Sequence, residues 1–493
     1  MSPLRQRYFI VISYVGLLIL GLGGVLLIPL VSLFFFPGEV SYLKSFLVPS
    51  LAAIGGGFSL WRGFRLKGEA LPLAAPDAAL IVTFIWIAAV ILGAIPFILA
   101  QVLSPLNAVF ESMSGWTTTG LTMVNPDKVP HIFLFWRSLM QFVGGAGLVV
   151  IMLSAIVGSL GPGVYEAEAR SDHLVPHVMH TARMIIKIYL GYYLIGVVLY
   201  RLAGMDLFDS LSQAMSALST GGFSTHSANI AYWHSLPVEV VTIVLMLLGT
   251  TNFATHHVLL ASRGRKGFRD TELKLMGWLI IVITPLIAFS LFRSGLGNLG
   301  DSFRKGLFQV VSALTGTGYS TTNLNNWSDF PIFLLIILMI VEGGTGSTAG
   351  GIKLYRAAII IKSIWWWIKK QFYPSSAVIQ RAIWRRGERL EVQDKHIQAV
   401  AGFIGLYLLT YLVGVLIFLG SGFSLRQSMF EFASAMGTVG LSLGITAPNM
   451  PLGTKVAEIF GMWLGRLEFI AIFHAFIRIG QDLKMSKNKR GQG

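Results

Sequence analysis

Hydrophobic segments recur along the whole chain of 493 residues, and their lengths fall into two classes. The long runs have 18 or more mostly apolar residues, which is the length of a membrane-spanning helix. We expect such helices at roughly 8–36, 45–62, 78–100, 131–157, 183–202, 235–261, 273–293, 331–371 with an interruption, 394–419 and 453–480. The pattern predicts an all-α polytopic membrane protein.

Shorter apolar segments lie between some of the long ones, at 105–116, 207–218, 303–314 and 425–436. Each would form a helix of only about 18 Å, whereas the hydrocarbon core of a bilayer is about 30 Å thick. These segments therefore cannot cross the membrane, and we interpret them as re-entrant or interfacial helices.

Every short segment is followed by a loop with a glycine in the same register. The local sequences are WTTTGLT, LSTGGFS, LTGTGYS and MGTVGLS, around Gly120, Gly222, Gly318 and Gly440. A hydroxyl residue follows two places later in each case: Thr122, Ser224, Ser320 and Ser442. A serine precedes each glycine by six places: Ser114, Ser216, Ser312 and Ser434. The same unit thus occurs four times along the chain.

The beginning of each short helix carries a matching signal. Good helix N-cap residues stand sixteen places before the glycines, and we expect them to cap the short helices: Ser104, Asp206, Ser302 and Ser424. Pro105 would then occupy the favoured first helical position.

The repetition predicts four pseudo-symmetric helix–pore-loop–helix repeats around a central pore, preceded by two additional helices. The expected division is 1–77 for the leading transmembrane helices, 78–160 for repeat 1, 183–262 for repeat 2, 273–372 for repeat 3 with a loop at 343–353, 394–481 for repeat 4, and 482–493 for a cytoplasmic tail.

The charge distribution predicts how the chain is oriented. The formal net charge is +15, yet only 12% of residues are charged and the mean hydropathy is +0.68. Basic clusters fall between the repeats or after the last one: Arg62–Lys67, Arg263–Lys274, Lys353–Lys395 and Arg478–Arg490. Positive residues favour the cytoplasmic side and attract anionic lipid, so both termini are expected in the cytoplasm and the glycine loops on the outside. This distribution argues against nucleic-acid binding.

Four polar loops at membrane depth need partners for their backbone groups, and lining a common pore supplies them. A cation that loses its water needs a ring of oxygens, which backbone carbonyls provide when some loop residues take positive φ. A single loop of this kind would more often be a turn or a packing site between helices; the fourfold register favours a pore. The expected ion-binding residues are Thr118, Thr119, Gly120, Thr220, Gly221, Gly222, Gly316, Thr317, Gly318, Thr438, Val439 and Gly440.

A second glycine-rich stretch, GGTGSTAGGIK at Gly343–Lys353, interrupts the last long helix of repeat 3. Its glycines cannot form a stable helix interior, at about 1 kcal/mol each relative to alanine. We interpret it as a break that bends beneath the pore loops. One alternative is a passive kink. The other is a phosphate-binding loop, which the lack of a surrounding βαβ unit argues against. The candidate gating residues are Gly343, Gly344, Gly346, Gly350, Gly351, Lys353 and Arg466.

Arg466 stands in the apolar stretch MWLGRLEFIAIFHAF, where an arginine should face a cavity or a partner. The alternative to a role in gating is a structural ion pair with Glu468 or Glu342. A further set of polar residues lies nine places before the glycines and either braces the loops or faces the outer vestibule: Glu111, Gln213, Gln309 and Glu431. The spacing of His173, His177 and His180 only weakly suggests a metal site.

The four loops, the repeat and the GGTGSTAGGIK segment resemble the Trk/Ktr/HKT superfamily of potassium transporters, over about residues 8–480. The two leading helices resemble the TrkH-type membrane subunit, whereas the glycine-rich segment looks closer to the Ktr type. The resemblance implies that glycine in all four loops favours potassium, that 343–353 is a gating loop, and that Arg466 is a barrier below the filter. It also implies a homodimer with a cytosolic nucleotide-binding regulatory subunit of the TrkA/KtrA type, whose ligand could be ATP/ADP or NAD/NADH.

These observations predict potassium uptake through a selective pore at the bacterial inner membrane. Potassium is then the transported substrate, no tightly bound organic cofactor is expected, and nucleotide acts only through the regulatory partner. The alternative is a sodium- or proton-coupled secondary transporter with inverted repeats, which the parallel basic clusters disfavour. An intramembrane enzyme would need one nucleophile–base pair, which the sequence does not offer, and the absence of cysteine excludes disulfides and thiolate metal sites.

Overall fold

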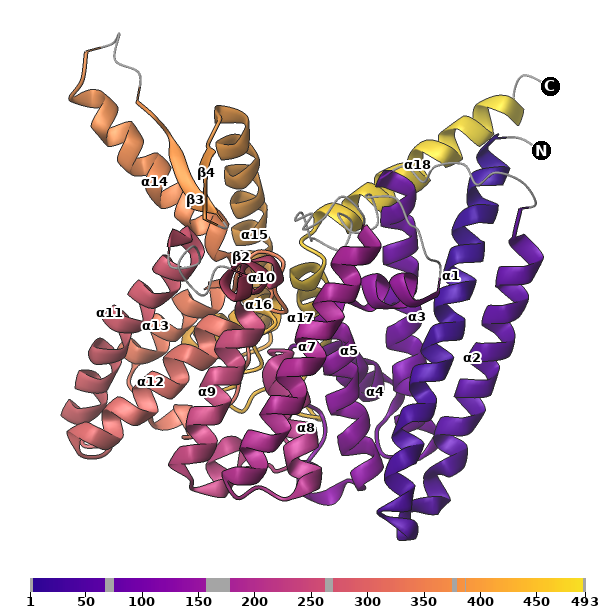
Figure 1. Ribbon diagram of the computed structural model, residues 1–493, viewed down its shortest axis with the longest axis horizontal. Helices are drawn as coiled ribbons and strands as arrows, with labels where there is room; N and C mark the ends of the chain where they lie inside the picture. The colour runs from indigo at the N-terminus through magenta and orange to yellow at the C-terminus, as the bar shows by residue number, and fades with distance from the viewer. Residues whose placement is uncertain are drawn as a thin grey trace. The chain divides into compact units, whose positions relative to one another are not determined.

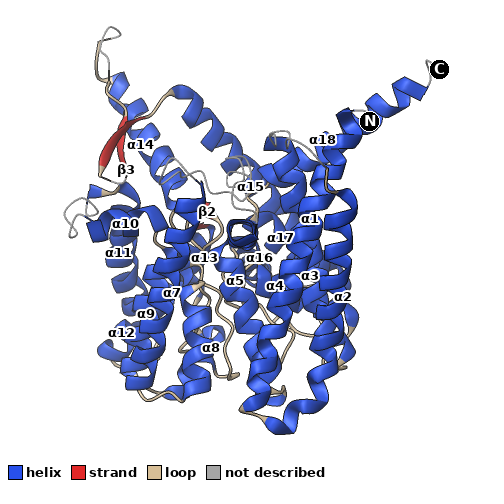
Figure 2. Ribbon diagram, turned by 45° about the vertical axis from the view of Figure 1, so that its right-hand side comes forward, coloured by secondary structure: helices blue, strands red, loops and turns tan. Residues whose placement is uncertain are grey.

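The computed structural model describes residues 3–66, 75–156, 178–261, 269–374, 379–385 and 387–490. Helices make up most of it (Figure 2). His173 and His177 lie outside the described residues. The chain forms two compact units, one of Met1–Thr117, Thr122–Gly191 and Leu467–Gly493, the other of Thr118–Leu121 and Tyr192–Arg466.

The first unit contains both leading helices, most of the first repeat and the last helix. Its elements are α1 (Pro3–Leu27), continued by a 3-10 turn at Ile28–Phe34, then α2 (Leu43–Phe64), α3 (Ala75–Leu99), α4 (Pro105–Trp116), α5 (His131–Ile156) and α18 (Ile470–Arg490). In this unit α1 packs along α2, and both α1 and α18 pack on α3. Both chain ends therefore lie at the same end of the unit (Figure 1). The last helix continues beyond residue 481, where the tail was expected to begin.

The second unit holds the remaining elements, and α7 (Val178–Leu202) leads into it. The helices are α8 (Leu207–Leu218), α9 (Leu236–Thr250), α10 (Phe253–Ala261), α11 (Thr271–Arg293), α12 (Leu299–Thr315), α13 (Asp329–Ile340), α14 (Leu354–Gln371), α15 (Asp394–Gly420), α16 (Leu425–Gly437) and α17 (Leu452–Arg466). Two short strand pairs were not expected: parallel β1 (Val341–Glu342) with β2 (Ile352–Lys353), and antiparallel β3 (Ala382–Arg385) with β4 (Glu388–Glu391).

Within the described residues, six helical segments are long and apolar enough to cross a membrane: Leu4–Phe34, Pro37–Phe64, Pro76–Leu99, Met184–Leu202, Thr271–Arg293 and Asp394–Gly420. Two shorter apolar helices, Leu236–Thr250 and Asp329–Ile340, end at breaks in the chain. The expected all-α, multi-pass architecture is confirmed by these helices.

Two helices expected to be continuous are broken. The 235–261 segment is interrupted between α9 and α10, because the carbonyl of Thr250 accepts from the N–H of Gly344 at 2.9 Å instead of from its own helix. The 453–480 segment is interrupted after Arg466, where Glu468 and Phe469 have left-handed φ angles of 53° and 62°. The helix α5 is not broken but is kinked at Gly147, where φ is 94°.

The short helices begin as expected in three of four repeats. Ser104, Asp206 and Ser424 are the N-cap residues of α4, α8 and α16. The expectation for Ser302 is wrong, because α12 begins one turn earlier. Its N-cap is Asn298, whose side-chain oxygen accepts from the N–H of Asp301 at 2.8 Å. Asn298 is itself a favoured cap residue. Because the helix begins there, Ser302 lies inside the helix and is buried.

Candidate functional site

Each glycine loop contains two left-handed residues at the same repeat positions. The first ends the short helix, and its φ is 58° at Thr118, 52° at Thr220, 70° at Gly316 and 57° at Thr438. The second is the aligned glycine, with φ of 92°, 77°, 81° and 94° in chain order. Left-handed threonine costs about 1–3 kcal/mol and persists only where the surroundings impose it, which is typical of functional sites. Positive φ is expected from the sequence at the glycines but not at the threonines.

The four loops close into a ring, all of it within the second unit. Each aligned glycine packs against a backbone carbonyl of the next loop, and that carbonyl belongs to the residue directly before the next loop's own aligned glycine. A Cβ on the glycine would overlap this oxygen. The contacts run in order: Gly120 against Gly221, Gly222 against Thr317, Gly318 against Val439, and Gly440 against Thr119. The structure therefore brings all four predicted loops together, with backbone oxygens at every junction.

The polar residues nine places before the glycines brace the loops, which answers the question left open by the sequence. All four are fully buried. Each hydrogen-bonds the hydroxyl two places after the glycine: Thr122 to Glu111 at 2.9 Å, Gln213 to Ser224 at 2.9 Å, Gln309 to Ser320 at 3.2 Å, and Ser442 to Glu431 at 2.7 Å. A short helix and its loop are thus joined by a side chain in every repeat.

Two of these braces are carboxylates, Glu111 and Glu431, and they have different neighbours. Glu111 forms an ion pair of 2.7 Å with Arg137, the seventh residue of α5, and both side chains are at most 2% exposed. Glu458, the seventh residue of α17, holds the equivalent position in repeat 4. The Thr446 hydroxyl lies 3.0 Å from Glu431 and 3.1 Å from Glu458. Arg137 is not among the residues predicted from the sequence, although a lone arginine in the apolar stretch HIFLFWRSLM is the signal that could have revealed it.

The Gly343–Lys353 loop is closed at its base by β1 and β2, with Glu342 paired in register with Lys353. The Lys353 ammonium donates to the Ala349 carbonyl inside the loop. Three of its predicted glycines have left-handed φ: Gly343, Gly346 and Gly351, at 56°, 69° and 63°. Glycine at these three positions thus allows the backbone to turn back, so that β2 can pair with β1.

This loop and Glu342, which directly precedes it, together touch all four glycine loops. The Thr348 carbonyl accepts from the Thr118 hydroxyl at 3.4 Å, and the Thr348 and Thr220 hydroxyls lie 2.7 Å apart. Gly350 packs directly against Thr438, with no room for a side chain. In the third loop, Gly316 lies against the Glu342 carboxylate. Thr348, which sequence analysis did not single out, is therefore the main contact residue.

Arg466 also reaches this loop, since its guanidinium donates to the Thr348 carbonyl. The remaining predicted residue, Gly344, lies against the end of α9, where its N–H bonds Thr250. The structure therefore gathers the ring residues, the loop glycines and Arg466 into one constellation of the second unit.

Comparison with known proteins shows the family of the whole chain. The chain matches the TrkH family, described as a cation transport protein, over residues 57–279 and 272–487. The chain belongs to the TrkH family. It is 34% identical over 469 residues to an uncharacterized cation transporter, MJ1485, of Methanocaldococcus jannaschii, covering 92% of this chain and 94% of the relative.

Other TrkH family members cover the chain equally well. The Trk system potassium uptake protein TrkH of Escherichia coli K12 is 30% identical over 482 residues, 94% of this chain and 97% of its own. The crystal structure of the potassium transporter TrkH from Vibrio parahaemolyticus superimposes with a TM-score of 0.82 at 27% identity, over 96% of this chain and 98% of that one. The TrkH-type resemblance seen in the sequence is confirmed.

Proposed function

We propose that this protein mediates potassium uptake across the bacterial inner membrane, with the four glycine loops as its selectivity filter. The observation that carries the proposal is the closed order of contacts, in which each aligned glycine packs against a carbonyl of the next loop. The names of the E. coli and V. parahaemolyticus relatives support potassium as the substrate.

The chemistry of the ring suits a dehydrated monovalent cation. Backbone carbonyls replace the water of the ion, and the braces behind the loops hold those oxygens at a fixed spacing. The C-terminal ends of α4, α8, α12 and α16 lead into the loops, and the negative end of a helix dipole favours a cation. The twelve loop residues named from the sequence are the proposed ion-binding set.

The Gly343–Lys353 loop is the proposed gate. It contacts all four glycine loops through Thr348, Gly350 and the preceding Glu342, so an ion leaving the ring would meet it directly. Arg466 holds the Thr348 carbonyl and adds a positive charge to the path. Opening then requires the loop to move and this hydrogen bond to break.

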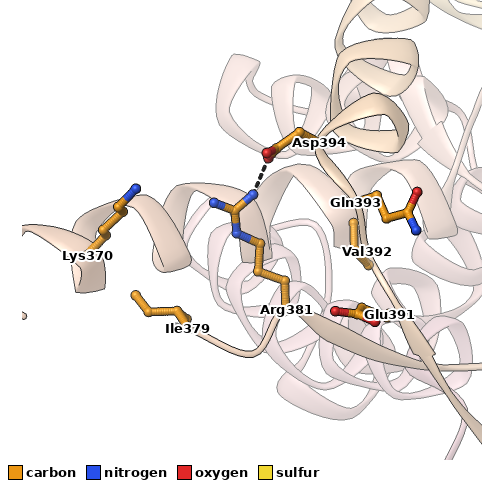
Figure 3. Close-up of a pocket in the computed structure, with 7 residues that line it drawn as sticks. All are labelled: Lys370, Ile379, Arg381, Glu391, Val392, Gln393 and Asp394. Carbon is orange, nitrogen blue, oxygen red and sulfur yellow. Dashed lines mark hydrogen bonds and ion pairs between the residues drawn. The ribbon is translucent and has the colours of Figure 1, made fainter. Parts of the chain in front are cut away.

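The proposed assembly is a homodimer with both termini in the cytoplasm and a nucleotide-binding regulatory subunit of the TrkA/KtrA type. A polar cavity of about 390 Å³ beside the open end of the β3–β4 hairpin, between the end of α14 and the start of α15, offers a docking surface for such a subunit (Figure 3). Lys370, Arg381 and Glu391 line it, and Arg381 pairs with Asp394. The four-repeat division is part of the same proposal.

The test is cation flux through the purified protein in proteoliposomes, measured separately with potassium, rubidium, sodium and lithium. Potassium and rubidium are expected to pass much faster than sodium and lithium. Equal sodium and potassium flux would contradict a potassium-selective filter, and a flux that requires a sodium or proton gradient would favour a coupled transporter.

Arg466→Ala is expected to raise basal rubidium flux by about 10- to 100-fold, because a hydrogen bond from a charged donor contributes about 1.5–3 kcal/mol and about 1.4 kcal/mol corresponds to tenfold. Arg293→Ala, at an exposed arginine at the end of α11, is the matched control. An Arg466→Ala protein with wild-type basal flux would remove this arginine from the gate.

A further inference from the structure

A buried glutamate at the start of α11 holds the Gly343–Lys353 loop. Glu272 is the second residue of that helix and is only 6% exposed. Its Oε1 accepts from the backbone N–H of Thr345 at 3.1 Å and from the Thr345 hydroxyl at 2.7 Å. Burying a carboxylate is costly unless hydrogen bonds compensate for its lost hydration. Because both of these bonds go to one residue, the carboxylate ties the loop to the first turn of α11.

The same loop is also held by the end of α9. The Thr250 carbonyl accepts from the N–H of Gly344 at 2.9 Å, and the Gly249 carbonyl accepts from the Thr348 hydroxyl at 3.0 Å. The last carbonyls of a helix have no partner within it, and here the loop supplies their donors. Both acceptors are backbone atoms, so side-chain substitutions leave them in place. Glu272 contributes a side-chain acceptor, which a substitution removes.

The turn that carries Glu272 is in contact with the β3–β4 hairpin. The Asp270 side chain caps α11 by accepting from the N–H of Glu272 at 2.8 Å. The Thr271 hydroxyl accepts from the backbone N–H of Trp384 in β3 at 3.0 Å. The Arg269 guanidinium lies 5.7 Å from the centre of the Trp384 ring. The hairpin is therefore fixed to the residue directly before Glu272.

The hairpin also packs on the helix that leaves the loop. Ile383 of β3 is 1% exposed and belongs to one apolar cluster with Ile359 of α14 and Val400 of α15. The helix α14 begins at Leu354, directly after the loop. The hairpin thus joins α14 to the first turn of α11, and both of these elements hold the loop. All of these contacts lie within the second unit.

We propose that Glu272 is a positioning residue of the gate, and that the β3–β4 hairpin acts on the gate through the Thr271–Glu272 turn. The inference rests on the proposed function, because it needs the Gly343–Lys353 loop to block the ion path. Arg466 of α17 holds this loop at Thr348, next to the glycine loops, whereas Glu272 holds it three residues earlier. Closure then depends on two side-chain anchors that come from different helices.

Glu272→Ala is expected to raise basal rubidium flux in proteoliposomes several-fold, because the N–H and hydroxyl of Thr345 lose their acceptor. Glu272→Gln keeps an acceptor oxygen and is expected to give a smaller increase. Glu388→Ala, at an exposed glutamate of β4, is the matched control and is expected to behave as wild type. Each flux is normalised to the amount of monodisperse protein.

Thr271→Val tests the link to the hairpin. Valine has nearly the shape of threonine but cannot accept from the N–H of Trp384. This variant is expected to raise basal flux by less than Glu272→Ala does, because the lost hydrogen bond is exposed to solvent. Thr271→Ser keeps the hydroxyl and is expected to behave as wild type. In a Glu272→Ala background, Thr271→Val is expected to add nothing, because its effect passes through Glu272.

A thiol in the loop distinguishes release of the loop from a general loss of stability. The chain has no cysteine, so Ser347→Cys introduces a single thiol at a position that is 6% exposed. A small thiol reagent is expected to modify this thiol faster when Glu272→Ala is also present. Ser428→Cys, buried in α16, is the matched reporter of general opening, and its rate of modification is expected to stay unchanged.

Wild-type flux in Glu272→Ala would overturn the inference, while leaving the gate in place if Arg466→Ala alone still raises basal flux. If neither variant raises it, the proposed gate itself fails and the inference falls with it. Equal acceleration of modification at Ser347→Cys and Ser428→Cys would overturn the inference as well, because it would show a general loss of stability. Additive effects of Thr271→Val and Glu272→Ala would overturn the role of the hairpin.

Discussion

Replacing Gly318 by alanine is expected to lower potassium flux about 10- to 100-fold, which corresponds to about 1.4–2.7 kcal/mol. The added Cβ would overlap the Val439 carbonyl oxygen and push it away from its place in the proposed filter. The left-handed φ of 81° adds a cost of about 1–2 kcal/mol for any residue with a side chain. The measurement is rubidium and sodium flux in proteoliposomes, where the ratio of the two should also fall.

Gly295→Ala is the matched control for this substitution. Gly295 has φ of 71°, yet a Cβ there would meet no atom of the described residues within 4 Å. Alanine at this position therefore adds the same kind of backbone strain without the carbonyl overlap. Flux through the Gly295→Ala protein should stay near the wild-type value. Equal losses in the two variants would mean that strain alone explains the result and that the glycine ring does not coordinate the ion.

Arg137→Met is expected to cause the largest loss of stability, about 3–5 kcal/mol, because it leaves Glu111 as a buried charge without its ion-pair partner. Glu111 would still accept from the N–H of Met123 at 2.6 Å, but that neutral donor does not compensate a full charge. Thermal unfolding of the detergent-solubilised protein should shift to clearly lower temperature, with less monodisperse protein recovered.

Two further variants make this result specific. Glu111→Gln combined with Arg137→Met removes both charges, keeps a polar brace for Thr122, and should recover much of the lost thermal stability. Arg293→Met, at an exposed arginine, should leave the unfolding temperature unchanged. A double variant as unstable as Arg137→Met alone would show that arginine packing, rather than charge pairing, stabilises this repeat.

The sequence was most informative where the determinants are local or repeated. The glycine register located all four loops, and Asp206 and Ser424 marked helix starts because an N-cap acts on residues two or three places away. The break at Gly343–Lys353 was visible because glycine itself disfavours a helix.

The breaks that were missed have non-local causes. The end of α9 is set by Gly344 and Thr348, about a hundred residues later in the chain, so nothing in the local sequence near Thr250 announces it. The break after Arg466 occurs at Glu468 and Phe469, which carry no turn signal. Ser302 was misassigned as a cap because two cap residues competed and the earlier one, Asn298, begins the helix.

The order of contacts around the ring also explains which loop positions are free to differ. Carbonyls are offered by two threonines, a glycine and a valine: Thr119, Thr317, Gly221 and Val439. Different side chains are accepted there because it is the backbone oxygen that meets the neighbouring glycine. The glycines themselves are identical, since any side chain would collide with the next loop. The four loops can thus differ in most of their side chains while the contacts between them stay equivalent, as long as each loop keeps the glycine that meets the carbonyl of the next loop.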